Sequence, residues 1–498
     1  MRRQRKVSHL IVALVIATTG LCLGILLTVI NMPLEGGAIA LLGFGPVYLS
    51  LDRKHTPDLL IGPLGVFFFF HALSYSIGPL AQRYILHFEN YIEEGMIRAQ
   101  WGAALGLATF ALVYHIVFRG VIYRFRKSEE QRVSTITSES EWRRYTALLV
   151  AISGLLLIYG YQSGGMRRIG TIDGVDVQTF TALYTFINVQ YVAFFFLGTL
   201  AVKRRGWWIV LAVFLSLFYA VFQTLEGNRG QLIYSSLMLA TGTVWAGFSV
   251  RKTLLALSMV GLILIPLAGV VDLYRSNTSA LKYDEGFLER LSVFVQFAKF
   301  ANSGEATPGE KVANQAGIFA ISTLTVDRIM AMTPDIIPHA GFDNMDAVFY
   351  VYMPAVLAPN RPDIDDGNII AFDYGVGEGK GARSWVYTPS VGDGFRRFGW
   401  LGIPLIYTFS GIIFGASVGI CWVKRQKPVW AAMLVFLVLQ TILAVGFTFN
   451  YLFYFALFFL PKNFFYFFVL KKLQVFITSF YCCFRKPLLR QRVVNHQI

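Results

Sequence analysis

Charged residues are scarce in this sequence, and their scarcity defines its class. Only 15% of the 498 residues are Asp, Glu, Lys or Arg, while 55% are hydrophobic. Soluble globular proteins carry about 25% charged residues, and the polar residues present here are too few to cover so apolar a chain. The composition therefore excludes a soluble globular protein and indicates an integral membrane protein whose solvent is lipid.

Cysteine is equally rare, with 4 residues in the whole chain. Cys22 and Cys421 fall inside hydrophobic runs, whereas Cys482 and Cys483 lie in the C-terminal tail. None of them lies in a segment that we place outside the membrane. The sequence therefore excludes a small secreted domain that is held together by disulfides.

Acidic residues are fewer than basic ones, 29 against 44, and the net charge is +15. A strongly basic balance also occurs in nucleic-acid-binding proteins. Here, however, the basic residues form short clusters between hydrophobic runs, as at Arg2–Lys6 and Lys203–Arg205. That distribution is typical of connections retained on the cytoplasmic side of a membrane, and we expect no nucleic-acid partner.

Long hydrophobic runs, by contrast, are abundant. About twelve can cross a bilayer, where each must be helical because lipid offers the backbone no hydrogen-bond partner. The first run is longer than the core of a signal peptide, so we predict a first span rather than a cleaved leader. The predicted spans are Leu10–Ile30, Gly36–Ser50, Leu59–Leu80, Trp101–Phe118, Thr146–Tyr161, Gln178–Val202, Gly206–Leu225, Gln231–Val250, Thr253–Leu273, Trp400–Val423, Val429–Gly446 and Tyr451–Leu470.

The orientation follows from Lys and Arg in the short connections. With the N-terminus inside, every short connection on that side is basic, and both termini are cytoplasmic. We predict an all-α, multi-pass protein of the cell inner (cytoplasmic) membrane. Residues 1–271 would form a bundle of about nine spans, 272–399 one large outer loop, 400–470 the C-terminal spans and 471–498 a basic cytoplasmic tail.

The outer loop differs from the rest of the chain, because it is rich in acidic residues, Pro, Gly, Asn and aromatic residues. Apolar residues at three- and four-residue spacing predict amphipathic helices over 287–301 and 317–332. Loops of this length are uncommon unless they are functional. We therefore expect any active site in this loop and at the helix ends that face it.

Arginines recur at the predicted outer surface. A guanidinium is permanently charged and can bind phosphate through two hydrogen bonds, so the group favours a polyanionic substrate. Taken singly, Arg229 is equally explained by contact with lipid phosphates, and each of the other arginines is better explained as a structural residue, as by an ion pair between Arg275 and Asp272. The arginines are Arg229, Arg275, Arg328, Arg361 and Arg383.

His339 is the only histidine of the outer loop. It is a candidate general base, or equally a turn residue at the surface. Asp363–Asp366 fits no defined cation-binding loop, and Gly375–Gly381 lacks the spacing of a phosphate loop. We predict neither a metal nor a cofactor.

Three segments together resemble the bacterial O-antigen polymerases and related oligosaccharide repeat-unit polymerases. Glu226–Gly230 is similar to the family's Gly-Ser-Arg-Gly turn, which opens a span. The second segment runs from Asp327 to Gly341 and closes with Pro359–Pro362. The third is Thr388–Phe395, which leads through Arg397-Phe398-Gly399 into the next span. Order and spacing match over residues 220–425.

The resemblance implies a GT-C-like glycosyltransferase that transfers a glycan from a polyprenyl diphosphate onto a lipid-linked repeat unit. By this resemblance Arg229, Arg328 and Arg361 would hold the diphosphate, and Asp393 or His339 would orient or deprotonate the acceptor hydroxyl. The implied partners are the lipid-linked oligosaccharide, membrane lipids, a chain-length regulator and a flippase. The product would be an O-antigen or an exopolysaccharide.

Two other functions remain open. One is an O-antigen ligase, which moves the glycan to lipid A. The other is a flippase or transporter of lipid-linked sugars, but transporters usually carry internal repeats and broken helices at the bilayer midplane. The polar residues here concentrate in one asymmetric outer loop, which favours an enzyme.

Overall fold

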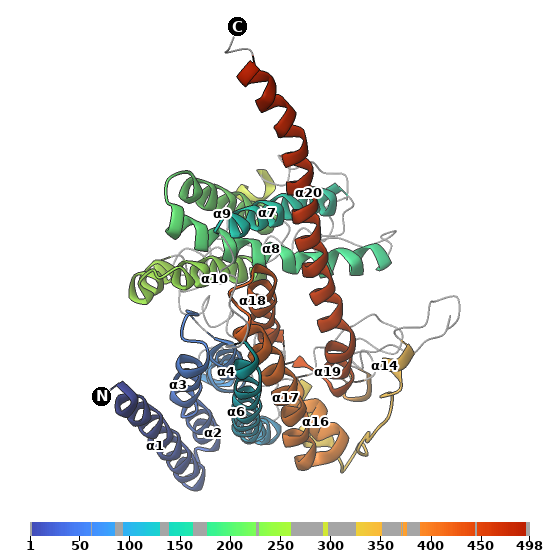
Figure 1. Cartoon of the computed structure of the whole chain (residues 1–498). Helices are drawn as coiled ribbons and strands as arrows, with labels where there is room; N and C mark the ends of the chain where they lie inside the picture. The colour runs from blue at the N-terminus through green and yellow to red at the C-terminus, as the bar shows by residue number, and fades with distance from the viewer. Residues whose placement is uncertain are drawn as a thin grey trace.

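The structure is a computed structural model, and it describes most of the chain as helices (Figure 1). Every regular element within the described ranges is helical, as the composition predicts. The described residues are 2–60, 62–84, 93–129, 139–162, 177–225, 229–259, 292–296, 325–350, 370, 372–375, 389–443 and 446–494.

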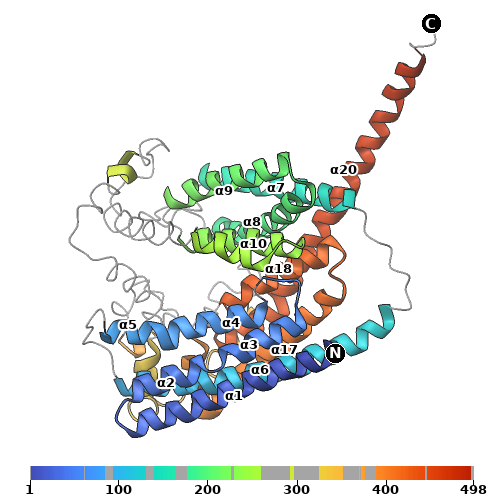
Figure 2. The ribbon, with the colours of Figure 1, turned by 90° about the vertical axis from the view of Figure 1, so that its left-hand side faces the viewer.

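The helices form two groups, which Figures 1 and 2 show as two layers. The first group comprises α1 (Arg2–Val29), α2 (Pro33–Leu42), α3 (Gly45–His55), α4 (Pro63–Ala72), α5 (Gly78–Tyr84), α6 (Glu93–Glu129), α16 (Ser390–Phe398), α17 (Gly402–Val423), α18 (Pro428–Leu443) and α19 (Phe449–Tyr454). The second comprises α7 (Glu139–Gln162), α8 (Val177–Arg204), α9 (Trp207–Leu225) and α10 (Arg229–Trp245). Helix α18 contacts both groups, as does α20 (Leu460–Val494).

By length and composition, six helices of the described part can cross a membrane, and two shorter apolar helices accompany them. The protein is therefore membrane-embedded. The six are His9–Val29, Pro33–His55, Pro63–Ala81, Glu94–Phe125, Ser390–Val423 and Phe449–Ser479; the shorter ones are Trp207–Phe222 and Pro428–Thr441.

The count of about twelve spans stays a prediction for the remaining segments. Helices α7, α8 and α10 form where spans are predicted, while most of the span predicted over 253–273 lies outside the described residues. At the C-terminus, Phe449–Ser479 is one helix interrupted by a π-helical turn at Phe455–Phe459, and it runs beyond the predicted end at Leu470. In the outer loop, 292–296 and 325–332 are helical, and the rest of the two predicted amphipathic helices lies outside the described residues.

Glycines allow the main helices to approach at backbone distance. A Cβ added to Gly415 of α17 would lie 3.0 Å from the Tyr114 carbonyl oxygen of α6, and one on Gly198 of α8 would lie 2.2 Å from the Leu239 carbonyl oxygen of α10. Such small-residue contacts suit helices in lipid, where association depends on close packing. Helices α6 and α17 run in the same direction, because Gly102 faces Ile403 at one end and Val121 faces Gly419 at the other.

Basic residues gather at one end of the first group. Helix α3 ends with Arg53 and Lys54, and α17 is followed by Lys424 and Arg425. The C-terminal part of α6 reaches the same end, because the His115 and His55 rings lie 2.8 Å apart, Nδ1 to Nε2. The start of α1 also lies at this end, because His9 lines a cavity together with Arg53 and Lys54. We call this the basic end.

Candidate functional site

A cavity opens at the other end of the first group, where α6 and α17 begin. Its volume is ≈ 500 Å³, and residues 336–340, 343–344 and 372–374 line it together with Arg396 of α16. Segments that are distant in the sequence therefore meet at one site. Its polar side chains are His339, Asp343, Asn344, Asp373, Tyr374 and Arg396.

Helix α16 supplies an ion-pair network beside this cavity. Asp393 lies one helical turn before Arg396 and Arg397, so all three side chains share a face. The Asp393 Oδ1 atom is 2.8 Å from Arg396 Nη2 and 3.2 Å from Arg397 Nε. The Phe449 backbone N–H donates to Asp393 Oδ2 at 2.8 Å. The side chains of Asp393 and Arg397 are both 0% exposed.

The network ties the cavity wall to the membrane helices. Arg397 Nη1 donates to the carbonyl oxygens of Gly341 and Asp343 at 3.1 and 2.8 Å. In return, the Ala340 backbone N–H donates to the Arg396 carbonyl oxygen at 3.0 Å. The loop that carries His339 is thus fixed to α16, and Asp393 fixes α16 to the start of α19.

This setting favours a positioning role for Asp393. A general base needs an open path to the proton that it removes, whereas Asp393 is fully buried and both of its oxygens accept hydrogen bonds. Two guanidinium groups also stabilise its charged form. Its prediction as a base is untested, and the geometry assigns it to holding Arg396 and Arg397 in place.

His339 lines the cavity, with Nδ1 3.3 Å from the Arg396 carbonyl oxygen. A carbonyl only accepts, so in the neutral imidazole this bond puts the proton on Nδ1 and the lone pair on Nε2. An imidazole fixed in this way suits proton transfer, because a hydrogen bond at one ring nitrogen sets the tautomer of the other.

Arg328 supports another part of the cavity wall. It lies on the helical stretch 325–332, which packs across the start of α6, where Arg98 Nη1 donates to the Met330 carbonyl oxygen at 3.0 Å. Arg328 Nη1 donates to the carbonyl oxygens of Gly375 and Tyr374 at 2.7 and 3.3 Å. The guanidinium therefore contacts backbone next to the cavity rather than lining the cavity itself.

Tyr374 completes that wall. Its hydroxyl is 2.8 Å from Thr333 Oγ1, and burial raises the pKa of the Tyr374 hydroxyl above its usual value. The phenol therefore stays protonated and keeps its hydrogen bond at physiological pH. Together with Arg328, this bond holds residues 372–375 against the helical stretch 325–332.

The structure does not describe the side chains of the other predicted arginines. Arg229 is the first residue of α10, which packs on α8 and α9, and the described cavity lining includes no residue of α10. The side chain of Arg229 is outside the described part, as are Arg275, Arg361 and Arg383 altogether. The diphosphate clamp predicted from Arg229, Arg328 and Arg361 thus stays a prediction.

Arg396 is the site residue that the sequence interpretation missed. It lines the cavity, yet it lies in the middle of the predicted motif, between Asp393 and Arg397. The i, i+3 spacing from Asp393 is the signal that could have found it. Within the described residues, no three His, Cys, Asp or Glu side chains are grouped so that they could hold a metal ion.

Comparisons with protein-family models, with curated proteins and with solved structures found no match. The interpretation of the site therefore depends on its residues and their geometry.

Proposed function

We propose that this protein polymerises lipid-linked oligosaccharide repeat units into a surface polysaccharide, either an O-antigen or an exopolysaccharide. One observation carries the proposal: two of the three segments that resemble repeat-unit polymerases, around Asp327–Gly341 and Ser390–Gly399, build the walls of a single cavity. Their convergence supports a shared site, because nothing in the sequence spacing alone requires it.

The distribution of charge supports an outward-facing site. Lys and Arg are retained on the cytoplasmic side of membrane proteins, and the cavity lies at the end of α6 and α17 remote from the basic end. The proposal therefore includes an inner-membrane protein with cytoplasmic termini, about twelve spans and a GT-C-like arrangement. Polyprenyl-diphosphate donors suit such a site, because they need no nucleotide.

In the proposed reaction the acceptor hydroxyl attacks the anomeric carbon of the donor glycan. The bond from that carbon to the phosphate oxygen breaks, and the polyprenyl diphosphate leaves with the electron pair. Arg396, which lines the cavity, would stabilise the charge that develops on the leaving group. His339 Nε2 accepts the hydroxyl proton, while Arg328 and Asp393 position the walls. Arg229, Arg275, Arg361 and Arg383 are further proposed diphosphate contacts.

Two alternative functions remain open because they would use the same surface. An O-antigen ligase would transfer the finished glycan to lipid A, and a flippase would move the lipid-linked unit without chemistry. The fixed His339 tautomer and the buried network around Arg396 favour an enzyme, because a transporter gains nothing from a pre-set proton acceptor.

A deletion strain complemented with variants tests the proposal. We expect Arg328→Ala and Arg229→Ala to leave protein in the membrane, abolish long glycan chains and accumulate single repeat units on lipid. The matched control is Arg251→Ala, an exposed arginine on the helical stretch 250–259, which should give wild-type chains. Electrophoresis of the glycan and mass spectrometry of the lipid-linked pool provide the readout.

The outcomes separate the functions. Accumulated full-length chains on lipid would identify a ligase, and repeat units confined to the cytoplasmic leaflet would identify a flippase. Full-length polymer from Arg229→Ala would contradict the diphosphate clamp, and full-length polymer from Arg328→Ala would contradict the role of Arg328 in positioning the cavity wall.

A further inference from the structure

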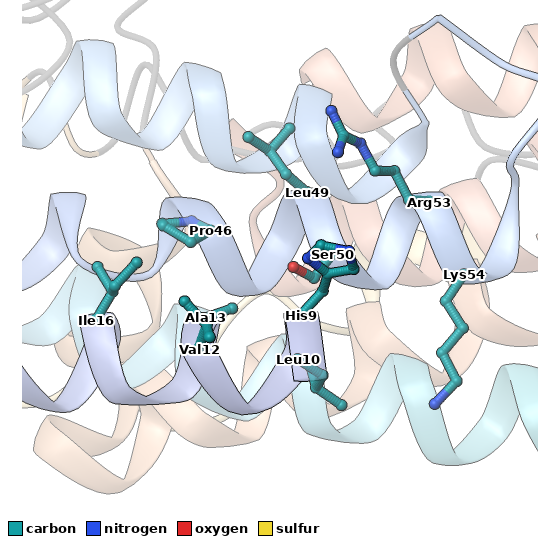
Figure 3. Close-up of a pocket in the computed structure, with 10 residues that line it drawn as sticks. All are labelled: His9, Leu10, Val12, Ala13, Ile16, Pro46, Leu49, Ser50, Arg53 and Lys54. Atoms are coloured by element: carbon teal, nitrogen blue, oxygen red, sulfur yellow. The ribbon is translucent and has the colours of Figure 1, made fainter. Parts of the chain in front are cut away.

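A groove separates α1 from α3 at the basic end (Figure 3). Farther along, glycines bring α1 and α2 into contact: a Cβ on Gly24 would lie 2.5 Å from the Gly36 carbonyl oxygen. Nearer the basic end, the helices present Ala13 and Pro46 instead, and a cavity of ≈ 610 Å³ remains between them. The groove therefore forms where these close glycine contacts end.

The walls of the groove are apolar. Val12, Ile16 and Leu49 are 55%, 44% and 52% exposed although they belong to membrane-spanning helices. Exposed apolar side chains in such helices face lipid tails rather than water. The groove thus matches a hydrocarbon chain in both polarity and position. Its apolar lining consists of Leu10, Val12, Ala13, Ile16, Pro46 and Leu49.

One end of the groove is basic. Arg53 and Lys54 lie at its mouth, with His9 and Ser50 beside them (Figure 3). The neighbouring acid does not neutralise this rim, because Asp52 is buried and accepts hydrogen bonds from the backbone N–H groups of Leu64 and Gly65. An apolar groove with a cationic rim at the membrane surface combines the two features that bind an anionic lipid.

We propose that this groove binds an anionic phospholipid from the leaflet at the basic end. One acyl chain lies between α1 and α3, and the phosphate contacts Arg53 and Lys54, with His9 and Ser50 as further hydrogen-bond partners. The proposal is independent of the glycan activity, because it concerns the end of the bundle remote from the cavity with His339 and Arg396.

Two other occupants fit less well. A second copy of this chain would bring one basic end against another, since Arg53, Lys54, Lys424 and Arg425 share this end, and like charges repel. A zwitterionic lipid has no net charge to match the rim. Charge complementarity therefore selects the anionic lipid.

Lipid binding can be measured on the full-length protein in nanodiscs of phosphatidylcholine, with and without phosphatidylglycerol. Native mass spectrometry should show retained phosphatidylglycerol and little retained phosphatidylcholine. The double variant Arg53→Gln with Lys54→Gln should weaken retention by roughly thirtyfold, which corresponds to about 2 kcal/mol for two basic side chains near an anionic surface. Leu49→Trp should reduce retention by filling the groove without a change of charge.

The matched control removes the same charges elsewhere: Arg251→Gln with Lys252→Gln changes an exposed basic pair outside the groove and should leave retention unchanged. Equal loss from this control, or equal retention of both lipids by the wild-type protein, would overturn the proposal. So would displacement of the lipid by inorganic phosphate, or a dimer that dissociates in Leu49→Trp. If the double variant fails to fold, lipid selectivity of the wild-type protein and Leu49→Trp still decide the question.

Discussion

Replacing Asp393 by Asn should destabilise the whole protein. The carboxylate is completely buried, and it forms an ion pair with Arg397, whose side chain is also 0% exposed. Asn keeps an amide oxygen that can accept from the Phe449 backbone N–H, so the substitution removes mainly the charge. Removing one partner of a buried ion pair costs about 3–5 kcal/mol, because the other charge stays buried.

Thermal unfolding of the purified protein in detergent, followed by the fraction of protein that stays folded and soluble, measures this loss. The control is Asp58→Asn, whose carboxylate is 49% exposed and lies 3.4 Å from Arg425 Nη2. An exposed pair contributes about 0–1 kcal/mol, so this variant should unfold close to the wild-type temperature. Adding Arg397→Gln to Asp393→Asn should recover part of the loss, because the uncompensated charge is gone.

The competing interpretation makes the opposite prediction. If Asp393 were the base that activates the acceptor hydroxyl, Asp393→Asn would unfold like the wild-type protein while losing all polymerisation. That pattern would refute the positioning role argued from the buried network. A parallel loss of melting temperature and of polymer supports it.

Two further predictions concern the membrane helices. Gly198→Ala should cost about 1–3 kcal/mol by overpacking, because its Cβ would lie 2.2 Å from the Leu239 carbonyl oxygen. The control Gly154→Ala on α7 has nothing within 4 Å and should be neutral or slightly stabilising. Melting temperatures compare the two variants, and equal losses would contradict the close α8–α10 contact. Tyr407→Phe should cost about 1–3 kcal/mol, because the Tyr407 hydroxyl lies 2.6 Å from the buried His71 Nε2. A wild-type melting temperature for Tyr407→Phe would show that this bond adds no stability.

Hydropathy predicts the apolar helices and charge predicts the basic end, because a lipid bilayer constrains both properties at every residue. An apolar run such as Leu10–Ile30 must be helical in a bilayer, and the structure confirms a membrane-length helix at His9–Val29. The clusters after α3 and α17 lie at one end, as the basic connections indicated. Span ends are less predictable: nothing in the local hydropathy at Leu470 shows that α20 continues to Val494.

The cavity is harder to predict because backbone groups assemble it. Arg397 recognises the carbonyl oxygens of Gly341 and Asp343, and Arg328 recognises those of Tyr374 and Gly375. A carbonyl is present at every residue, so the sequence holds no side-chain signal for these contacts. That His339 lies near α16 therefore becomes visible only once the chain is folded.

The chemistry of the motif also depends on which way each side chain points, and the composition of the motif does not specify this. Asp393, Arg396 and Arg397 are all polar residues of one short helix, and an acid beside two bases can serve either as catalyst or as anchor. Helical spacing puts both guanidinium groups against the carboxylate, and in a buried setting mutual neutralisation has the lower free energy. Of the three, Arg396 also reaches the cavity. Asp393 is thus best suited to a supporting role, and under the proposed function Arg396 is the residue of the three that would contact phosphate.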